Sequence, residues 1–133
     1  MKYCADTWFI LKLFKKDSKA LSIFNDAKYG KARILIPITV YAETRKKLMQ
    51  EGCSSAIIEQ FFGGAEISSK ICLIFADKQI AEEASKISFS YSVPLIDSFV
   101  AATYKLTGCE ILLAHDEDYD LLAKKKYLKV QYW

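Results

Sequence analysis

Short apolar runs alternate along this chain with longer stretches in which apolar residues recur every three or four positions. Such alternation is typical of buried parallel strands separated by helices. The runs predict strands at residues 2–6, 33–36, 71–76, 111–114 and 128–132, with a short extended stretch at 93–96. The periodic stretches predict helices at residues 7–16, 19–29, 39–50, 54–62, 77–89, 98–106 and 117–124. We therefore expect an α/β fold, a three-layer sandwich with a mostly parallel central sheet.

Glycines and an aspartate mark the predicted helix boundaries. Gly30 occupies the C′ position of the helix before it, and Gly63-Gly64 is expected to stop the helix that begins at residue 54. Asp77 directly precedes a helical pattern and is interpreted as an N-cap only.

Composition supports one domain over residues 1–133. Hydrophobic residues make up 52% of the chain, enough for a substantial core. The formal charge of +3 permits an anionic partner without requiring one. Basic clusters at residues 12–16, 45–47 and 124–126 either face nucleic acid or form ordinary solvated surfaces, and the sequence does not separate these alternatives.

The spacing of the cysteines and the hydropathy of the chain give an expectation for the cellular compartment. The four cysteines are dispersed and form no CxxC pair, which favours free thiols in a reducing cytosol. Asp6 interrupts the N-terminal apolar residues early, unlike a signal peptide. No apolar stretch approaches the ~20 residues needed to cross a bilayer. We expect a cytoplasmic protein without a membrane partner.

Three apolar runs end on an aspartate, namely Asp6, Asp97 and Asp116. In open parallel sheets ligands bind beyond the carboxyl ends of the strands, so these residues are candidates for one acidic cluster. Two carboxylates repel by about 4 kcal/mol at ~4 Å and an effective dielectric constant of ~20. A divalent cation would offset that repulsion. The pattern indicates a metal-dependent phosphoryl-transfer enzyme.

Each acidic residue also has a simpler interpretation. Asp6 and Asp97 could each cap the following helix, although a capping carboxylate keeps one oxygen for a cation. Glu43 could form an exposed i,i+4 ion pair with Lys47 worth about 0.2–0.5 kcal/mol, and taken alone this reading is favoured. His115 is the only histidine, which excludes a multi-histidine metal site within one chain, and we interpret it as a loop residue.

Four blocks of sequence resemble the PIN-domain ribonucleases, especially the VapC-type toxins of toxin–antitoxin pairs. The blocks are Ala5-Asp6-Thr7 and residues 38–43, 94–103 and 108–119. The resemblance implies a PIN-like fold and a hydrolase, an endoribonuclease that uses Mg²⁺ or Mn²⁺ to cleave RNA.

The same resemblance implies the site residues. The family's catalytic, metal-binding acids match Asp6, Glu43, Asp97 and Asp116, and Asp118 matches the second acid of its Asp-x-Asp-aromatic ending. One ion would activate water for in-line attack, and a second could stabilise the leaving oxygen. Glu43 could bind that second ion or help deprotonate the water.

Partners also follow from the resemblance: RNA as substrate and a small, adjacently encoded antitoxin that blocks the cleft. Apolar residues on the early helices, Phe9, Leu13 and Phe14, suggest a homodimer surface or an antitoxin groove. Trp8 and Ala114 stand where the family usually has a small polar residue and a hydroxyl residue. These departures favour the alternative, a catalytically weak or inactive interaction protein on the PIN fold.

Overall fold

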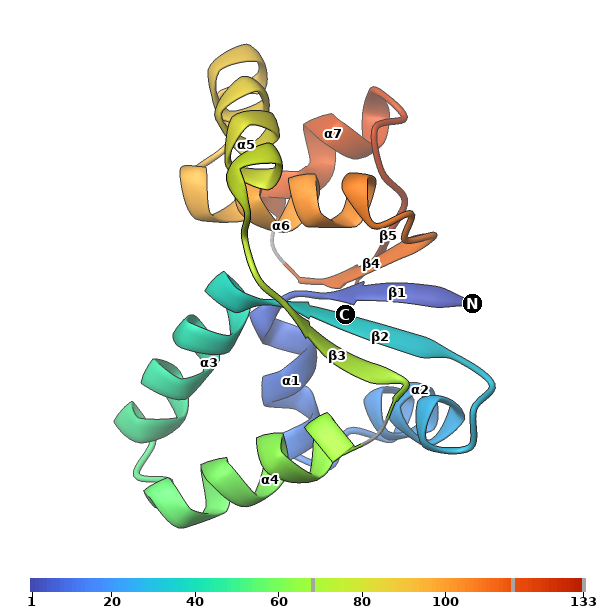
Figure 1. The fold of residues 1–133 in the computed structure, drawn as a ribbon, viewed down its shortest axis with the longest axis vertical. Helices are drawn as coiled ribbons and strands as arrows, with labels where there is room; N and C mark the ends of the chain where they lie inside the picture. Colours follow the sequence, from blue (N-terminus) through green and yellow to red (C-terminus); the bar gives the residue numbers. More distant parts are fainter. Residues whose placement is uncertain (68, 116, 133) are drawn as a thin grey trace.

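Five parallel strands form the central sheet of the computed structural model, which describes residues 1–67, 69–115 and 117–132 (Figure 1). The strands are β1 (Lys2–Ala5), β2 (Arg33–Pro37), β3 (Ile71–Ile74), β4 (Ile111–Ala114) and β5 (Val130–Tyr132). They lie side by side in the order β3-β2-β1-β4-β5. The predicted α/β fold with a parallel sheet is confirmed.

Helices cover both faces of this sheet and complete a three-layer sandwich (Figure 1). One face carries α1 (Thr7–Phe14), α2 (Ser18–Lys28), α3 (Ile38–Gln50) and α4 (Ser55–Ile67). The other face carries α5 (Lys78–Tyr91), α6 (Leu95–Leu106) and α7 (Asp120–Lys124), the last preceded by a 3₁₀ turn, η1 (Glu117–Tyr119). No helix of the described residues is both long and apolar enough to cross a membrane.

The connections change face between β1 and β4, which are neighbours in the sheet with Cys4 opposite Leu112. The chain leaves β1 toward α1 on one face and leaves β4 toward α7 on the other (Figure 1). In open α/β sheets, the crevice at such a switch point is where ligands bind. The residues that directly follow these two strands, Asp6 and His115, therefore lie at the favoured position for a site.

Small side chains bring α6 close to the sheet. Ala101 and Ala102 of α6 are fully buried, and the Cys4 Sγ of β1 lies 3.9 Å from the Val100 carbonyl oxygen of the same helix. Close packing of this kind leaves little freedom for the helix to shift, because protein interiors are packed at crystal-like density. The first turn of α6, which carries Asp97, is therefore held firmly against the carboxyl edge of the sheet.

The extended stretch predicted at residues 93–96 is wrong at Leu95 and Ile96, which are helical. Pro94 is the N-cap of α6, and the helix already begins at Leu95, so Asp97 lies in its first turn. Leu95 and Ile96 are 54% and 47% exposed, whereas a buried strand would enclose both. The apolar run resembled a strand only because its composition did not reveal that exposure.

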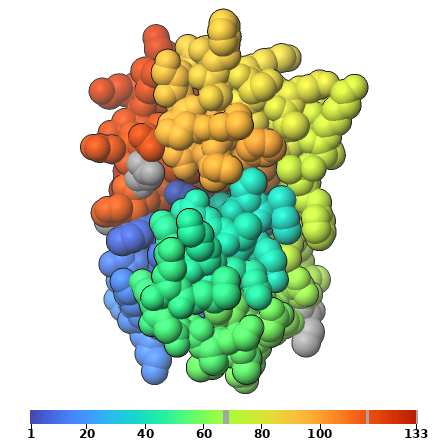
Figure 2. All heavy atoms as spheres, turned by 90° about the vertical axis from the view of Figure 1, so that its left-hand side faces the viewer, coloured from blue at the N-terminus to red at the C-terminus, as the bar shows by residue number. Residues whose placement is uncertain are grey.

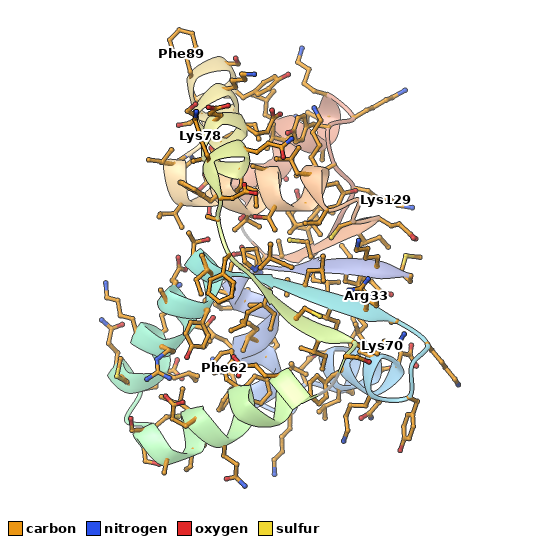
Figure 3. All side chains as sticks on the ribbon, viewed as in Figure 1. Arg33, Phe62, Lys70, Lys78, Phe89 and Lys129 are labelled. Atoms are coloured by element: carbon orange, nitrogen blue, oxygen red, sulfur yellow. The ribbon has the colours of Figure 1, made fainter. Side chains whose placement is uncertain are left out.

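The predicted stop at Gly63-Gly64 is also wrong, because α4 continues through both glycines to Ile67. Neither glycine has a positive φ, and a Cβ added to either would meet no atom within 4 Å. Buried Phe62, which points from α4 toward the sheet in Figure 3, and buried Ala65 hold the helix in place. Their burial outweighs the ~1 kcal/mol that each helical glycine costs relative to alanine. Gly30, with φ of 79°, does follow the end of α2 as predicted.

Candidate active site

An open cleft of about 650 Å³ lies at the carboxyl edge of the sheet. It is lined by Asp6, Thr7, Trp8, Glu43, Lys47, Asp97, His115 and Glu117. Figure 2 views the molecule from this side, where the blue start of α1, the teal α3 and the amber α6 meet. Segments distant in sequence thus contribute to one surface hollow at the switch point.

Three of the predicted catalytic acids, Asp6, Glu43 and Asp97, line this cleft together. Asp116, the fourth, lies outside the described residues. Asp118 lies in η1 and is not one of the lining residues. The catalytic and metal-binding roles given to these residues stay predictions.

Asp6 is fixed by β1, β4 and α1 together. Its backbone N–H donates to the carbonyl of Leu113 at 3.0 Å, and the Thr7 backbone N–H donates to its Oδ1 at 2.8 Å. Asp6 is therefore the N-cap of α1, where the positive end of the helix dipole favours a carboxylate. It is 9% exposed and still borders the cleft, so capping and cleft lining are compatible.

Asp97 is held by a buried tyrosine. The Tyr119 hydroxyl donates to Oδ1 of Asp97 at 3.3 Å, and Tyr119 itself is fully buried. Burial, followed by the nearby charges of Asp6 and Asp97, raises the pKa of Tyr119 well above its usual value. Tyr119 consequently remains a neutral hydrogen-bond donor to Asp97.

Glu43 both forms the ion pair with Lys47 and lies among the acids of the cleft. Its Oε1 lies 3.1 Å from the Lys47 ammonium, one turn further along α3, as the simpler interpretation predicts. Both residues also line the cleft. A carboxylate has two oxygens, so the ion pair leaves Glu43 able to contact a ligand in the cleft.

The chemistry of this acidic set fits a divalent cation. Carboxylate oxygens are the hard ligands that Mg²⁺ and Mn²⁺ prefer. Across residues 1–67, 69–115 and 117–132, no three His, Cys, Asp or Glu side chains are grouped closely enough to hold a metal. Asp116, a further predicted ligand, lies outside those residues.

Sequence reasoning assigned no site role to three aromatic residues. The rings of Trp8 and His115 stack with centroids 4.5 Å apart and an angle of 25° between their planes, and both line the cleft. Tyr119 contacts Asp97 from beneath the cleft. The available signal was proximity in sequence, since Trp8 follows Asp6 by two residues, and His115 and Tyr119 flank the acidic loop.

Basic residues are unequally placed around the cleft. Lys47 lines it, and the ammonium groups of Lys12 and Lys15 lie 5.5 and 5.9 Å from the centre of the Trp8 ring. The cluster at residues 124–126 follows the end of α7, and its Lys126 lines a separate hollow with Lys129, which Figure 3 labels at the opposite edge of the sheet. Only two of the three basic clusters are therefore placed to flank the acids.

Comparison with known proteins identifies the fold family. The family model described as PIN domain matches residues 3–125. The chain belongs to the PIN-domain family. The resemblance seen in the sequence is thereby confirmed at the level of the family, and PIN domains are in general nucleases.

Solved structures share this PIN fold. VapBC2 from Rickettsia felis, bound to a DNA fragment from their promoter, has a TM-score of 0.70 at 18% identity, covering 100% of this chain and 99% of that one. VapBC-1 from nontypeable Haemophilus influenzae has a TM-score of 0.68 at 20% identity, covering 100% of this chain and 98% of that one. A toxin–antitoxin complex from Klebsiella pneumoniae has a TM-score of 0.67 at 19% identity, covering 88% of this chain and 89% of that one. No curated protein sequence matches the chain.

Proposed function

We propose that this PIN-domain protein is a metal-dependent endoribonuclease and the toxin of a toxin–antitoxin pair. The observation that carries the proposal is the convergence of Asp6, Glu43 and Asp97 on one cleft at the switch point of a PIN fold. The toxin assignment is supported by the likeness in fold to VapBC structures.

Each of these residues has a separate role in the proposed phosphodiester cleavage. Asp6, Asp97 and Asp116 would hold Mg²⁺ or Mn²⁺, which when bound supplies positive charge at the scissile phosphate and lowers the pKa of water. Tyr119 orients the Asp97 carboxylate by its hydrogen bond. Glu43 either takes the proton of the attacking water or contributes to a second ion.

Lys12, Lys15 and Lys47 provide positive charge beside the acids. In the proposed complex they contact RNA phosphates on either side of the cleaved bond. Such contacts weaken as salt rises, because binding releases condensed counterions. The modest overall charge of +3 is sufficient for this role, since Lys47 lines the cleft and Lys12 and Lys15 lie beside Trp8, another lining residue.

The proposal is tested with purified protein, a labelled single-stranded RNA and DNA of the same sequence. With Mn²⁺ we expect cleavage of the RNA and little of the DNA. EDTA should abolish cleavage, because without a cation the carboxylates repel one another and also repel the negatively charged phosphate. Equal RNA cleavage in EDTA would contradict the metal-dependent mechanism.

A second hollow supports an antitoxin partner. This apolar groove, of about 270 Å³, is formed between α1 and α4 by Leu13, Phe14, Ile57, Gln60 and Phe61. Phe9, which sequence analysis placed on a partner surface, is instead a core residue. We propose that an apolar segment of the antitoxin occupies the groove. A second copy of this chain is the alternative occupant.

Ile57→Glu is expected to weaken antitoxin binding by about tenfold or more, because a charge in an apolar contact loses hydration without a partner. Ile57 is 53% exposed, so the substitution should leave the fold unchanged. The measurement is co-purification with the product of the adjacent short gene, with exposed Phe89→Glu on α5 as the control. Undiminished co-purification would reject the groove, and conversion of a dimer to a monomer in light scattering would assign it to self-association.

One observation favours the alternative function, a weakly active or inactive interaction protein. The large ring of Trp8 lines the cleft where PIN domains usually carry a small polar side chain. Tight partner binding without divalent-ion binding or RNA cleavage would select this alternative.

A further inference from the structure

We infer that Trp8 and His115 form a nucleobase-stacking subsite that takes an unpaired base of single-stranded RNA next to the acidic cleft. The inference rests on the proposed function and adds the substrate class that this site would recognise. Its first support is the ring pair itself, with centroids 4.5 Å apart and planes 25° from parallel, in the wall of the cleft.

The ring pair joins a residue packed against the core to an exposed residue. Trp8 lies in the first turn of α1, half-buried against the core, while His115 directly follows β4 and is exposed. Trp8 follows β1 and His115 follows β4, so the switch point brings one ring from beyond each of these neighbouring strands into a single stack. In the proposed complex, an unpaired base would add to this stack on the side of exposed His115.

The surroundings of the ring pair suit a nucleotide better than a neutral aromatic ligand. The ammonium groups of Lys12 and Lys15 lie 5.5 and 5.9 Å from the Trp8 ring centre, and Lys47 lines the same cleft. These cations would attract the phosphates that flank a base bound at the rings. The cleft volume of about 650 Å³ falls in the ~300–1,000 Å³ range of sites for small organic ligands.

Stacking of this kind selects unpaired bases. In a duplex each base is already stacked and must be extruded before it can reach a protein ring. In single strands, each base that stacks on an aromatic side chain contributes about 5-fold to 150-fold in affinity. Stacking is tolerant of base identity, so the subsite would favour single-stranded RNA without specifying a sequence.

The test measures binding, not cleavage. The reference protein carries Asp97→Asn, so that RNA stays intact, and the buffer contains Mg²⁺. The probes are fluorescein-labelled oligouridylate and a labelled RNA duplex of equal length, followed by fluorescence anisotropy. His115→Ala is compared with His115→Phe, which keeps an aromatic ring, and with Phe89→Ala, an exposed ring at the far end of α5 (Figure 3).

We expect His115→Ala to weaken oligouridylate binding by about tenfold, and His115→Phe to remain within about threefold of the reference. Phe89→Ala should change nothing, and duplex binding should not respond to His115→Ala. Circular dichroism confirms folding of each variant.

Four results would overturn the inference. The first three are unchanged single-strand binding by His115→Ala, equal losses in the Ala and Phe variants, and equal losses for single strand and duplex. The fourth is absence of any RNA binding by the reference. Failure of the proposed nuclease function has a separate signature, namely no RNA cleavage by the wild-type protein, whatever the anisotropy shows.

Discussion

Replacement of Asp97 by asparagine is expected to reduce RNA cleavage by at least about 100-fold while the fold is retained. Losing one precisely placed charge group from a transition state typically lowers rates by about 10²–10³. The amide oxygen can still accept the hydrogen bond that Tyr119 donates to Oδ1 of Asp97. Removing one of several neighbouring negative charges also relieves repulsion, so stability should not fall.

The matched control for this variant is Asp77→Asn. Asp77 caps α5, where its Oδ1 accepts the Ile80 N–H at 2.8 Å, and it is not one of the residues lining the cleft. Asparagine caps helices about as well as aspartate, so this control should fold and cleave RNA like the wild type. Single-turnover cleavage with Mn²⁺ gives the rates. Equal rates for Asp97→Asn and the wild type would show that the activity comes from a contaminant.

Ala101→Leu is expected to lower both stability and activity. Ala101 is fully buried in α6, which contacts α5, β1 and β2, and inserting methylenes into a packed core typically costs about 1–3 kcal/mol. Ala101 lies one turn after Asp97 on the same helix, so displacement of α6 would also shift that carboxylate. A shift of about 1 Å at a reacting group can cost about 100-fold in rate.

Urea unfolding and cleavage assays measure these two effects. Ala81→Leu provides the control, since it makes the same chemical change at an exposed position of α5. The account expects a lower unfolding midpoint and slower cleavage for Ala101→Leu only. Wild-type behaviour of both variants would show that close packing of α6 does not position Asp97.

Much of the fold could be predicted from the sequence because buried parallel strands are short and apolar. Strands β1, β2, β4 and β5 lie within a residue or two of their predicted ranges, as does the start of β3. The two errors concern exposure and glycine. Leu95 and Ile96 are apolar but exposed, and α4 tolerates Gly63-Gly64 because its neighbours are buried. Both facts depend on tertiary packing, which local composition does not encode.

Less of the candidate site than of the fold could be predicted from the sequence. Asp6 could be placed from its position after a strand, whereas Asp97 reached the cleft for a different reason, as a first-turn residue of α6. Glu43 depended on the resemblance to PIN domains, because its ion pair with Lys47 gave it a sufficient local role. The contact of Trp8 with His115 joins residues on either side of the switch point, and no periodicity predicts such a contact.

In the proposed site, carboxylates distant in sequence hold one divalent cation in the cleft. Calorimetric titration of the purified protein with Mn²⁺, in the absence of RNA, measures this binding. We expect saturable binding that Asp6→Asn, Asp97→Asn and Asp116→Asn each weaken at least about tenfold, while Asp77→Asn leaves it unchanged. Absence of binding by the wild type, or equal affinity in all five proteins, would contradict the account.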